Sequence, residues 1–207
     1  RYPRSRQAFF TSFCCPPNLL RTIVEVNGLT YCVAKNSVWV NLYGSNVLTT
    51  RLDRQELKLE QKTEYPWNGV VQIEVHECPS EEFNLRLRVP EWTDHASVFL
   101  NGKPLDKLPI ELGYIEIRRN WQAGDNLRLQ LPMSTRLMQA NPFVEEISNQ
   151  IAIQRGPIVY CLESIDLPEG IKLGQVVIPK DIEFSHQYES NFLQGITVLE
   201  GSASAKF

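Results

Sequence analysis

The sequence predicts a mainly β protein, with antiparallel β-sandwich domains preceded by one short helix. Three observations carry this prediction. Apolar and polar residues alternate with a period of two in several short segments, and no helical period follows Asn27. Turn-forming residues separate these segments at spacings of roughly 8–12 residues, which favours a sandwich over alternating strands and helices. Segments with one apolar and one polar face are typical of half-buried antiparallel sheets.

The predicted helix comes first and spans residues 19–26. It directly follows the run Cys14-Cys15-Pro16-Pro17-Asn18. Proline suits the first turn of a helix, because its ring pre-sets φ and because the N–H it lacks would have no partner there. The two cysteines are therefore expected beside a helix N-terminus, where the positive end of the helix dipole favours thiolate over thiol.

Five segments alternate well enough to predict strands. In the clearest of them, Phe83, Leu85, Leu87 and Val89 share one face. The other four alternate in the same way, so each is expected to bury one face. The five predicted strands are residues 38–43, 70–75, 83–89, 114–118 and 126–131.

Turn residues punctuate these strands. Asn101-Gly102 follows the apolar residues 98–100 and predicts a tight hairpin. Three prolines stand at strand ends, where a missing N–H is tolerated; they are Pro90, Pro109 and Pro132.

A domain boundary is predicted near residues 133–147, a stretch without a clean strand period that contains Asn141-Pro142. Further apolar segments follow at residues 151–154, 158–162 and 176–178. They predict a second, incomplete β region that begins near residue 148.

Composition excludes several classes of function. The 207 residues carry a net charge of −3 with both signs mixed along the chain, which excludes nucleic acid and anionic membranes as expected partners. No apolar run approaches the roughly 20 residues that span a bilayer. The charged start at residues 1–6 precedes no apolar segment, so no signal peptide is expected. Because the chain also lacks an initiator Met, we interpret it as a fragment or a processed piece of a larger protein.

The five cysteines do not form a disulfide framework, because their number is odd and their spacing irregular. Cys32 and Cys161 lie within apolar runs and are predicted to be small buried residues. Cys78 precedes Pro79 in a predicted loop.

The adjacent pair Cys14 and Cys15 allows three interpretations. They are two buried thiols before a helix, half of a zinc site, or a site with a catalytic thiolate. Adjacent ligands are less usual than the wider spacing of structural zinc sites, and no second pair of cysteines or histidines completes the set. A catalytic thiolate requires a nearby base, cation or metal.

The remaining polar and aromatic residues supply no such partner. His76, His95 and His186 are interpreted as surface or loop residues, and the acidic pairs at residues 81–82 and 145–146 as solvated. The large aromatic residues are predicted to cap the sandwich core rather than to form sugar-stacking platforms; they are Tyr65, Trp67, Trp92, Tyr114 and Trp121.

At Cys14-Cys15-Pro16-Pro17-Asn18 and Arg21, the chain resembles the zinc-dependent β-L-arabinofuranosidases of glycoside hydrolase family 127. Further stretches resemble the same family in the same order, and together they cover most of the chain to about residue 163. These stretches are residues 63–69, 87–92, 98–102, 118–125 and 155–161.

The resemblance implies an architecture and a site. Residues 1–30 are the last loop and helix of a catalytic (α/α)₆ barrel, residues 31–135 a β-sandwich, and residues 136–207 part of a second one. Cys14 is implied to be the nucleophile of a retaining hydrolase, and Cys14 and Cys15 are implied zinc ligands. The other zinc ligands and the acid/base glutamate belong to the upstream barrel, so the fragment alone is expected to be inactive and to bind zinc weakly or not at all.

The implied partners are a carbohydrate substrate, which is an arabinose-containing plant glycan, and the upstream barrel of the same protein. A homodimer is a further possible assembly that the sequence leaves open. The family implies a bacterial source, with cytoplasm or periplasm as the compartment. An alternative from another class is a non-catalytic β-sandwich module that binds carbohydrate or supports a neighbouring domain.

Overall fold

The structure is a computed structural model that describes residues 12–206. The described chain divides into two compact units, residues 12–133 and residues 134–206. The charged segment at residues 1–6 lies outside the described residues, as does the start of the predicted barrel segment.

The first unit opens with helix α1 (Cys15–Val26), which continues as one 3₁₀ turn, η1 (Asn27–Leu29). The helix begins four residues before the predicted start at residue 19. It does so because the two prolines occupy its first turn, where no backbone donor is required. Cys14 is the N-cap residue, and Asn18 N–H donates to the Cys14 carbonyl at 3.3 Å.

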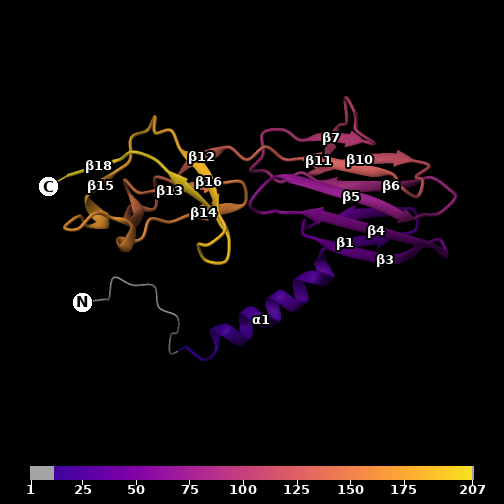
Figure 1. Ribbon diagram of the computed structural model, residues 1–207, viewed down its shortest axis with the longest axis horizontal. Coiled ribbons are helices and arrows are strands. Elements are labelled where there is room, and N and C mark those ends of the chain that lie inside the picture. The colour runs from indigo at the N-terminus through magenta and orange to yellow at the C-terminus, as the bar shows by residue number, and fades with distance from the viewer. Residues whose placement is uncertain (1–11, 207) are drawn as a thin grey trace. The chain divides into compact units, whose positions relative to one another are not determined.

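The rest of this unit is a sandwich of two sheets (Figure 1). The five-stranded sheet has the order β1-β2-β6-β10-β9 and the six-stranded sheet the order β3-β4-β5-β11-β7-β8. The first sheet comprises β1 (Tyr31–Ala34), β2 (Ser37–Val40), β6 (Phe83–Arg88), β10 (Tyr114–Arg119) and β9 (Ile110–Glu111). The second comprises β3 (Asn46–Leu52), β4 (Gln55–Thr63), β5 (Val70–Glu77), β11 (Asn126–Gln130), β7 (Ser97–Leu100) and β8 (Lys103–Pro104).

Strand pairing within the described residues is antiparallel as predicted, with one exception: β2 and β6 run parallel. Parallel neighbours need a crossover connection. Here β3, β4 and β5 provide it, because they lie between β2 and β6 in the chain and belong to the other sheet.

The core lies between the two sheets. The predicted inward face of β6 is confirmed, since Phe83, Leu85 and Leu87 are buried and Val89 packs against the core. The hairpin at Asn101-Gly102 is also confirmed. Its two central residues have φ of 50° and 79°, the left-handed values of a type I′ turn.

Two aromatic residues cap this core as predicted. Trp121 is only 3% exposed, and its indole N–H donates to the Phe83 carbonyl at 3.1 Å. Trp92 packs against the core from one side and lies 6.4 Å from the ring of Tyr65.

The prediction that Cys32 and Cys161 are buried is wrong, because both are exposed. Cys32 lies opposite Trp39 in the register of β1 and β2, so it belongs to the outer face of an edge strand. Cys161 follows the last residue of its strand rather than lying within it.

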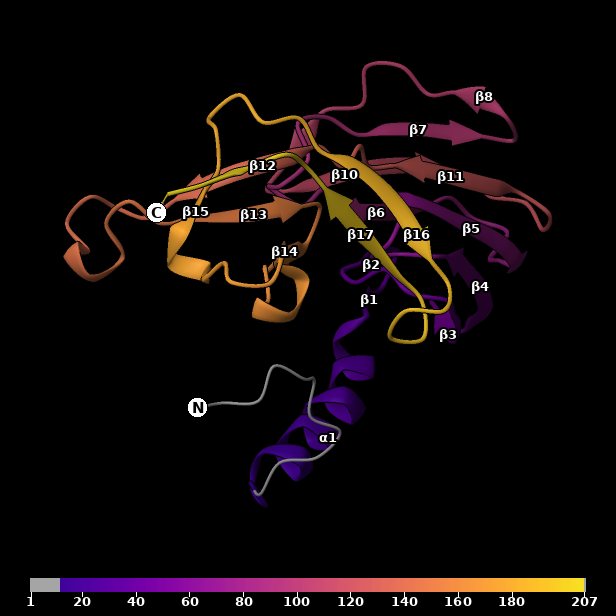
Figure 2. The same cartoon turned by 60° about the vertical axis from the view of Figure 1, so that its left-hand side comes forward.

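The second unit is also built from strands (Figure 2). A three-stranded sheet pairs β12 (Thr135–Gln139), β13 (Ile151–Arg155) and β14 (Ile158–Tyr160). Two pairs follow: β15 (Val176–Val177) with β18 (Ser204–Ala205), and β16 (Ser185–Glu189) with β17 (Ile196–Glu200). Short 3₁₀ turns connect them at η2 (Glu145–Ile147), η3 (Ser164–Asp166) and η4 (Leu173–Gln175). Strand β12 lies in the stretch that was predicted to have none.

Candidate functional site

The thiols of Cys14 and Cys15 meet at the start of α1. Their sulfur atoms lie 3.8 Å apart, and both side chains are exposed. Ser12 faces the pair, since its hydroxyl donates to Cys15 Sγ at 3.1 Å and lies 3.8 Å from Cys14 Sγ. Sequence reasoning missed Ser12, whose only signal is a hydroxyl two residues before the first thiol. Because both cysteines are exposed in the described structure, the interpretation as buried thiols is wrong.

The surroundings favour a thiolate at Cys14. Hydrogen bonds with Ser12, and then with Cys15, lower the pKa of the Cys14 thiol below its ordinary value. The N-cap position adds the positive end of the helix dipole. Asn18 is held over the same turn, because Arg21 Nη1 donates to Asn18 Oδ1 at 2.7 Å. The first turn of α1 therefore presents a thiol pair on an ordered backbone.

The spacing of the two sulfurs fits a zinc ion. Tetrahedral zinc with Zn–S bonds of about 2.3 Å holds two sulfurs about 3.8 Å apart, and the two thiols have this separation. Within residues 12–206, however, Cys14 and Cys15 belong to no group of three or more clustered ligand residues. The pair therefore supplies two ligands, and a full site requires others from elsewhere.

A different cluster within the described chain does bring three ligand residues together: Glu60, Glu74 and His76 on β4 and β5. His76 Nε2 lies 2.8 Å from Glu60 Oε2. Lys62 Nζ lies 3.1 Å from the same oxygen and 3.3 Å from Glu74 Oε2. The lysine ammonium thus compensates the carboxylates, so the cluster is a network of ion pairs on the outer face of its sheet.

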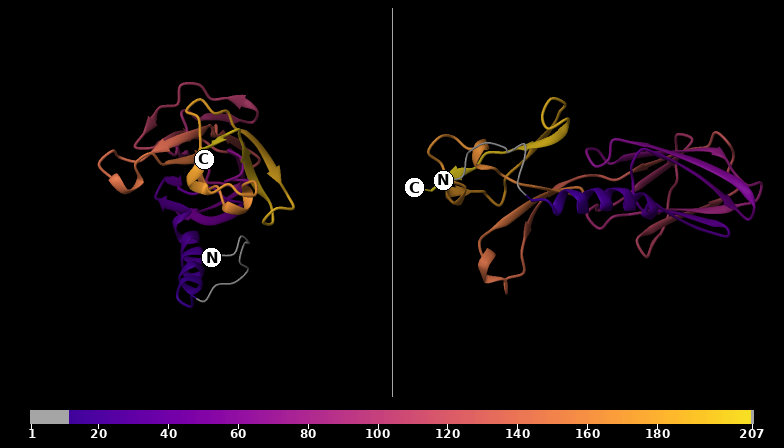
Figure 3. Two further views of the ribbon diagram at one scale, coloured as in Figure 1. Left: turned by 90° about the vertical axis from the view of Figure 1, so that its left-hand side faces the viewer. Right: turned by 90° about the horizontal axis from the view of Figure 1, so that it is seen from below.

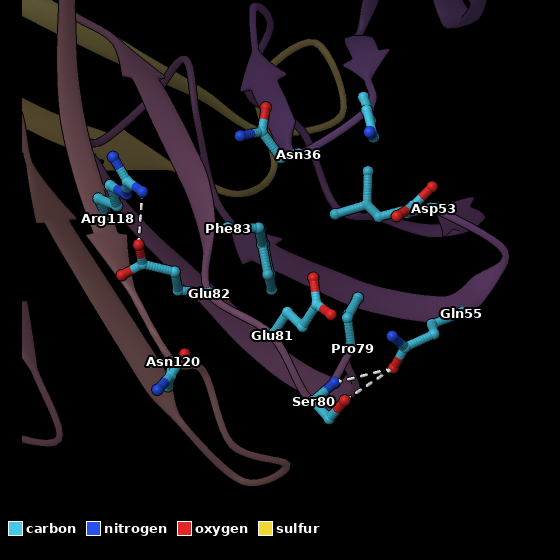
Figure 4. Close-up of a pocket in the computed structure, with 12 residues that line it drawn as sticks. Asn36, Asp53, Gln55, Pro79, Ser80, Glu81, Glu82, Phe83, Arg118 and Asn120 are labelled. Carbon is cyan, nitrogen blue, oxygen red and sulfur yellow. Dashed lines mark hydrogen bonds and ion pairs between the residues drawn. The ribbon is translucent and has the colours of Figure 1, made fainter.

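A polar cleft of about 670 Å³ opens between the sheets of the sandwich (Figure 4). Glu82 and Arg118, which both line it, form an ion pair, and Gln55 Oε1 accepts hydrogen bonds from the backbone and the hydroxyl of Ser80. Its one aromatic lining residue, Phe83, is 2% exposed. A buried ring offers no platform on which a sugar could stack, so the cleft does not favour the carbohydrate-binding module.

Helix α1 exposes apolar side chains along its length, and none of its residues is buried. Leu19, Leu20, Ile23 and Val24 are between 55% and 72% exposed. Their spacing places them on one stripe of the helix, which is the pattern of a helix that packs against a neighbour.

No helix in the described part of the chain is both long enough and apolar enough to cross a membrane.

Fold and site together define a protein of β-rich units that carries a thiol pair at the N-terminus of its leading helix. Two family models match this chain. They are the GH127 middle domain of β-L-arabinofuranosidase, over residues 37–133, and the C-terminal domain of glycoside hydrolase family 127, over residues 135–198. The chain belongs to glycoside hydrolase family 127 and contains its middle and C-terminal domains.

Individual relatives agree. A non-reducing end β-L-arabinofuranosidase of Bifidobacterium longum subsp. longum is 32% identical over 169 residues, which cover 79% of this chain and 25% of the relative. The crystal structure of a GH127 β-L-arabinofuranosidase from Geobacillus stearothermophilus T6 matches with a TM-score of 0.87 and 37% identity, covering 98% of this chain and 32% of that one. Another solved structure, described as a glycoside hydrolase, matches with a TM-score of 0.88 and 38% identity, covering 99% and 34%. The chain thus spans a quarter to a third of the length of these proteins.

Proposed function

We propose that the chain is the C-terminal part of a retaining β-L-arabinofuranosidase that acts on arabinose-containing plant glycans. The observation that carries this proposal is the thiol pair at the start of α1, where the pKa of Cys14 is lowered by hydrogen bonds with Ser12 and Cys15. Family membership supports the class of reaction, and the two named β-L-arabinofuranosidases support the sugar.

Cys14 is the proposed nucleophile. Its sulfur attacks the anomeric carbon, so that a C–S bond forms while the glycosidic C–O bond breaks, and the departing oxygen takes a proton from an acid outside this chain. Water then attacks the same carbon from the opposite side, the C–S bond breaks, and the water proton goes to the conjugate base. Two displacements at one carbon retain its configuration.

Cys14 and Cys15 are also the proposed zinc ligands of this chain. Zinc, when bound, keeps coordinated thiols ionised at neutral pH. Cys15 is the structural zinc ligand beside the nucleophile in this proposal, and the Ser12 hydroxyl donates to its sulfur.

The domain organisation is part of the same proposal. Residues 1–30 end a catalytic barrel, residues 31–135 form one sandwich, and residues 136–207 belong to a second. In this proposal the barrel covers the apolar stripe of α1. The stripe is exposed in this chain because most of the length of the related proteins, which includes the barrel, lies outside it. The 207-residue chain alone is then inactive and binds zinc weakly or not at all. Turnover of an aryl β-L-arabinofuranoside by the isolated chain, or tight stoichiometric zinc in elemental analysis, would contradict this.

Single substitutions in the full-length protein test the nucleophile. Cys14→Ser is expected to abolish turnover, and Cys15→Ser to lower the zinc content together with turnover. Cys161→Ser is the matched control, because Cys161 is also an exposed thiol and belongs to the second unit, outside the proposed site. Activity of Cys14→Ser near that of the wild type would show that Cys14 is not the nucleophile.

A further inference from the structure

The side chain of Asn41, which follows β2, links the end of the helical segment to the sandwich. The Asn41 amide group donates to the Leu29 carbonyl at 3.2 Å and to Cys32 Sγ at 3.4 Å. Its backbone N–H donates to the Thr30 carbonyl at 2.9 Å. Asn41 therefore binds the residues that end the helical segment as well as those that begin β1.

The same residue is anchored to the middle of the five-stranded sheet. Tyr114 Oη on β10 donates to Asn41 Oδ1 at 2.9 Å, and Arg88 Nη1 on β6 donates to the Asn41 carbonyl at 3.4 Å. Tyr114 and Arg88 face each other in the register of these two strands. The side-chain oxygen, the side-chain nitrogen, the backbone N–H and the backbone carbonyl of Asn41 are thus all engaged.

The helical end of the junction has little freedom. Helix α1 passes into η1 without a break (Figure 3). The next residue, Thr30, is 8% exposed. The Thr30 hydroxyl donates back to the Val26 carbonyl at 3.4 Å, and its carbonyl also accepts from Leu42 N–H at 3.4 Å. A change in the Asn41 contacts is therefore transmitted to the helix rather than absorbed by a flexible linker.

The length of α1 converts a small rotation at this junction into a displacement of the thiols at the other end of the helix. The 12 residues of α1 span about 18 Å at about 1.5 Å per residue. A rotation of about 3° at the C-terminal end moves Cys14 and Cys15 by about 1 Å. Displacements of about 1 Å between a nucleophile and its target can lower a rate by about 100-fold.

We propose that Asn41 is a positioning residue for the thiol pair: it fixes the angle of α1 to the five-stranded sheet, and the sandwich thereby sets where Cys14 lies in the active site. This inference rests on the proposed function for its catalytic consequence. Its structural part, an ordered junction that depends on the Asn41 amide, is independent of that function.

The test compares three variants of the full-length protein. Asn41→Ala removes every side-chain contact, Asn41→Asp keeps the acceptor for Tyr114 and loses both amide donations, and Tyr114→Phe removes one hydroxyl. Asn84→Ala is the matched control, since the Asn84 amide is buried in the same sheet and donates to Ser37 Oγ rather than to the helix junction.

Both Asn41 variants are expected to lower kcat about tenfold or more while KM changes less than about twofold. Tyr114→Phe is expected to lower kcat less, and Asn84→Ala not at all, even where it lowers the melting temperature as much. Hydrogen exchange gives a readout without activity: the amides of Thr30 and Leu42 should exchange about tenfold faster in Asn41→Ala than in Asn84→Ala.

Equal kcat values and equal exchange rates for Asn41→Ala and Asn84→Ala would overturn the inference. A wild-type protein that is well folded but does not cleave β-L-arabinofuranosides would instead contradict the proposed function. In that case the exchange rates alone decide whether Asn41 orders the junction.

Discussion

Cys14 and Cys15 present their sulfur atoms 3.8 Å apart, with the Ser12 hydroxyl facing both. Cys78 provides a contrast within the same chain. It is half-buried, and its thiol donates to the Trp121 carbonyl at 3.2 Å. Burial, and then the charge of Asp125, raise the pKa of Cys78 above its ordinary value, whereas hydrogen bonds lower the pKa of Cys14.

Alkylation by iodoacetamide should therefore modify Cys14 at lower pH than Cys78. The thiolate is the reacting form. Because the pKa of Cys14 is lowered and that of Cys78 raised, a larger fraction of Cys14 is ionised at any pH at which neither thiol is fully ionised. Mass spectrometry of peptides quenched at successive pH values, with a chelator present, measures both rates. Ser12→Ala should shift the Cys14 profile to higher pH and leave that of Cys78 unchanged. A Cys14 profile that does not move would contradict the assigned cause.

Gly69→Ala should destabilise the sandwich by about 2 kcal/mol or more. A Cβ atom at this position would lie 1.9 Å from the Leu131 carbonyl oxygen, and the obstacle is backbone that cannot rotate away. The same approach forms a hydrogen bond from Leu131 N–H to the Gly69 carbonyl at 2.9 Å. Urea unfolding of the full-length protein, followed by tryptophan fluorescence, measures the change.

Gly44→Ala is the control for this prediction, because a Cβ atom there meets nothing within 4 Å. It should change the free energy of unfolding by less than about 0.5 kcal/mol. Similar values for the two glycine variants would show that the contact at Gly69 relaxes without cost.

The local alternation of apolar and polar residues predicted most of the strands of the sandwich. It missed strands in which a polar residue takes a core position. The strands at β5, β6, β10 and β11 alternate cleanly and were predicted. Strand β4 was missed although Leu57 and Leu59 alternate with charged residues, and its core face continues with an amide, Gln61, at 1% exposure. It is accommodated there because Gln61 Nε2 donates to Tyr31 Oη at 2.7 Å, a contact between residues 30 positions apart that no local pattern reveals.

The candidate site was likewise predicted only in part from the sequence. The thiol pair and its place before a helix followed from the sequence, since both depend on adjacent residues. Ser12 was missed because its hydroxyl reaches the thiols only once the turn is folded. Asn41 was missed because its partners, Leu29 and Tyr114, are brought together by sheet order rather than by spacing in the chain.

Trp121→Phe should destabilise the sandwich by about 1–3 kcal/mol. The substitution retains a ring against Phe83 but removes the indole N–H, which donates to the Phe83 carbonyl at 3.1 Å in a buried position. That carbonyl then loses a partner without gaining water. Trp39→Phe is a suitable control, because Trp39 lies on the outer face and packs under the Arg86 guanidinium. Thermal unfolding of the two variants should differ clearly, and equal midpoints would contradict the role assigned to the indole hydrogen bond.

The ion-pair network on β4 and β5 should make stability depend on pH in the acidic range. Hydrogen bonds with His76, and then with Lys62, lower the pKa of Glu60 below its ordinary value of 4.5. A carboxyl with a lowered pKa in the folded state stabilises the fold fully above its unfolded pKa, and this contribution is lost as the pH falls through the folded value. The loss therefore begins near pH 4.5 and continues below it.

Glu60→Gln removes this contribution at every pH. The melting temperature of the wild type should exceed that of Glu60→Gln at pH 6–7, and the difference should shrink as the pH falls below about 4.5. Glu77→Gln, at the exposed end of β5, controls for the loss of one negative charge from the same sheet. A difference between wild type and Glu60→Gln that stays constant from neutral to acidic pH would mean that the glutamate acts through packing, because a charge interaction must vanish when the carboxyl is protonated.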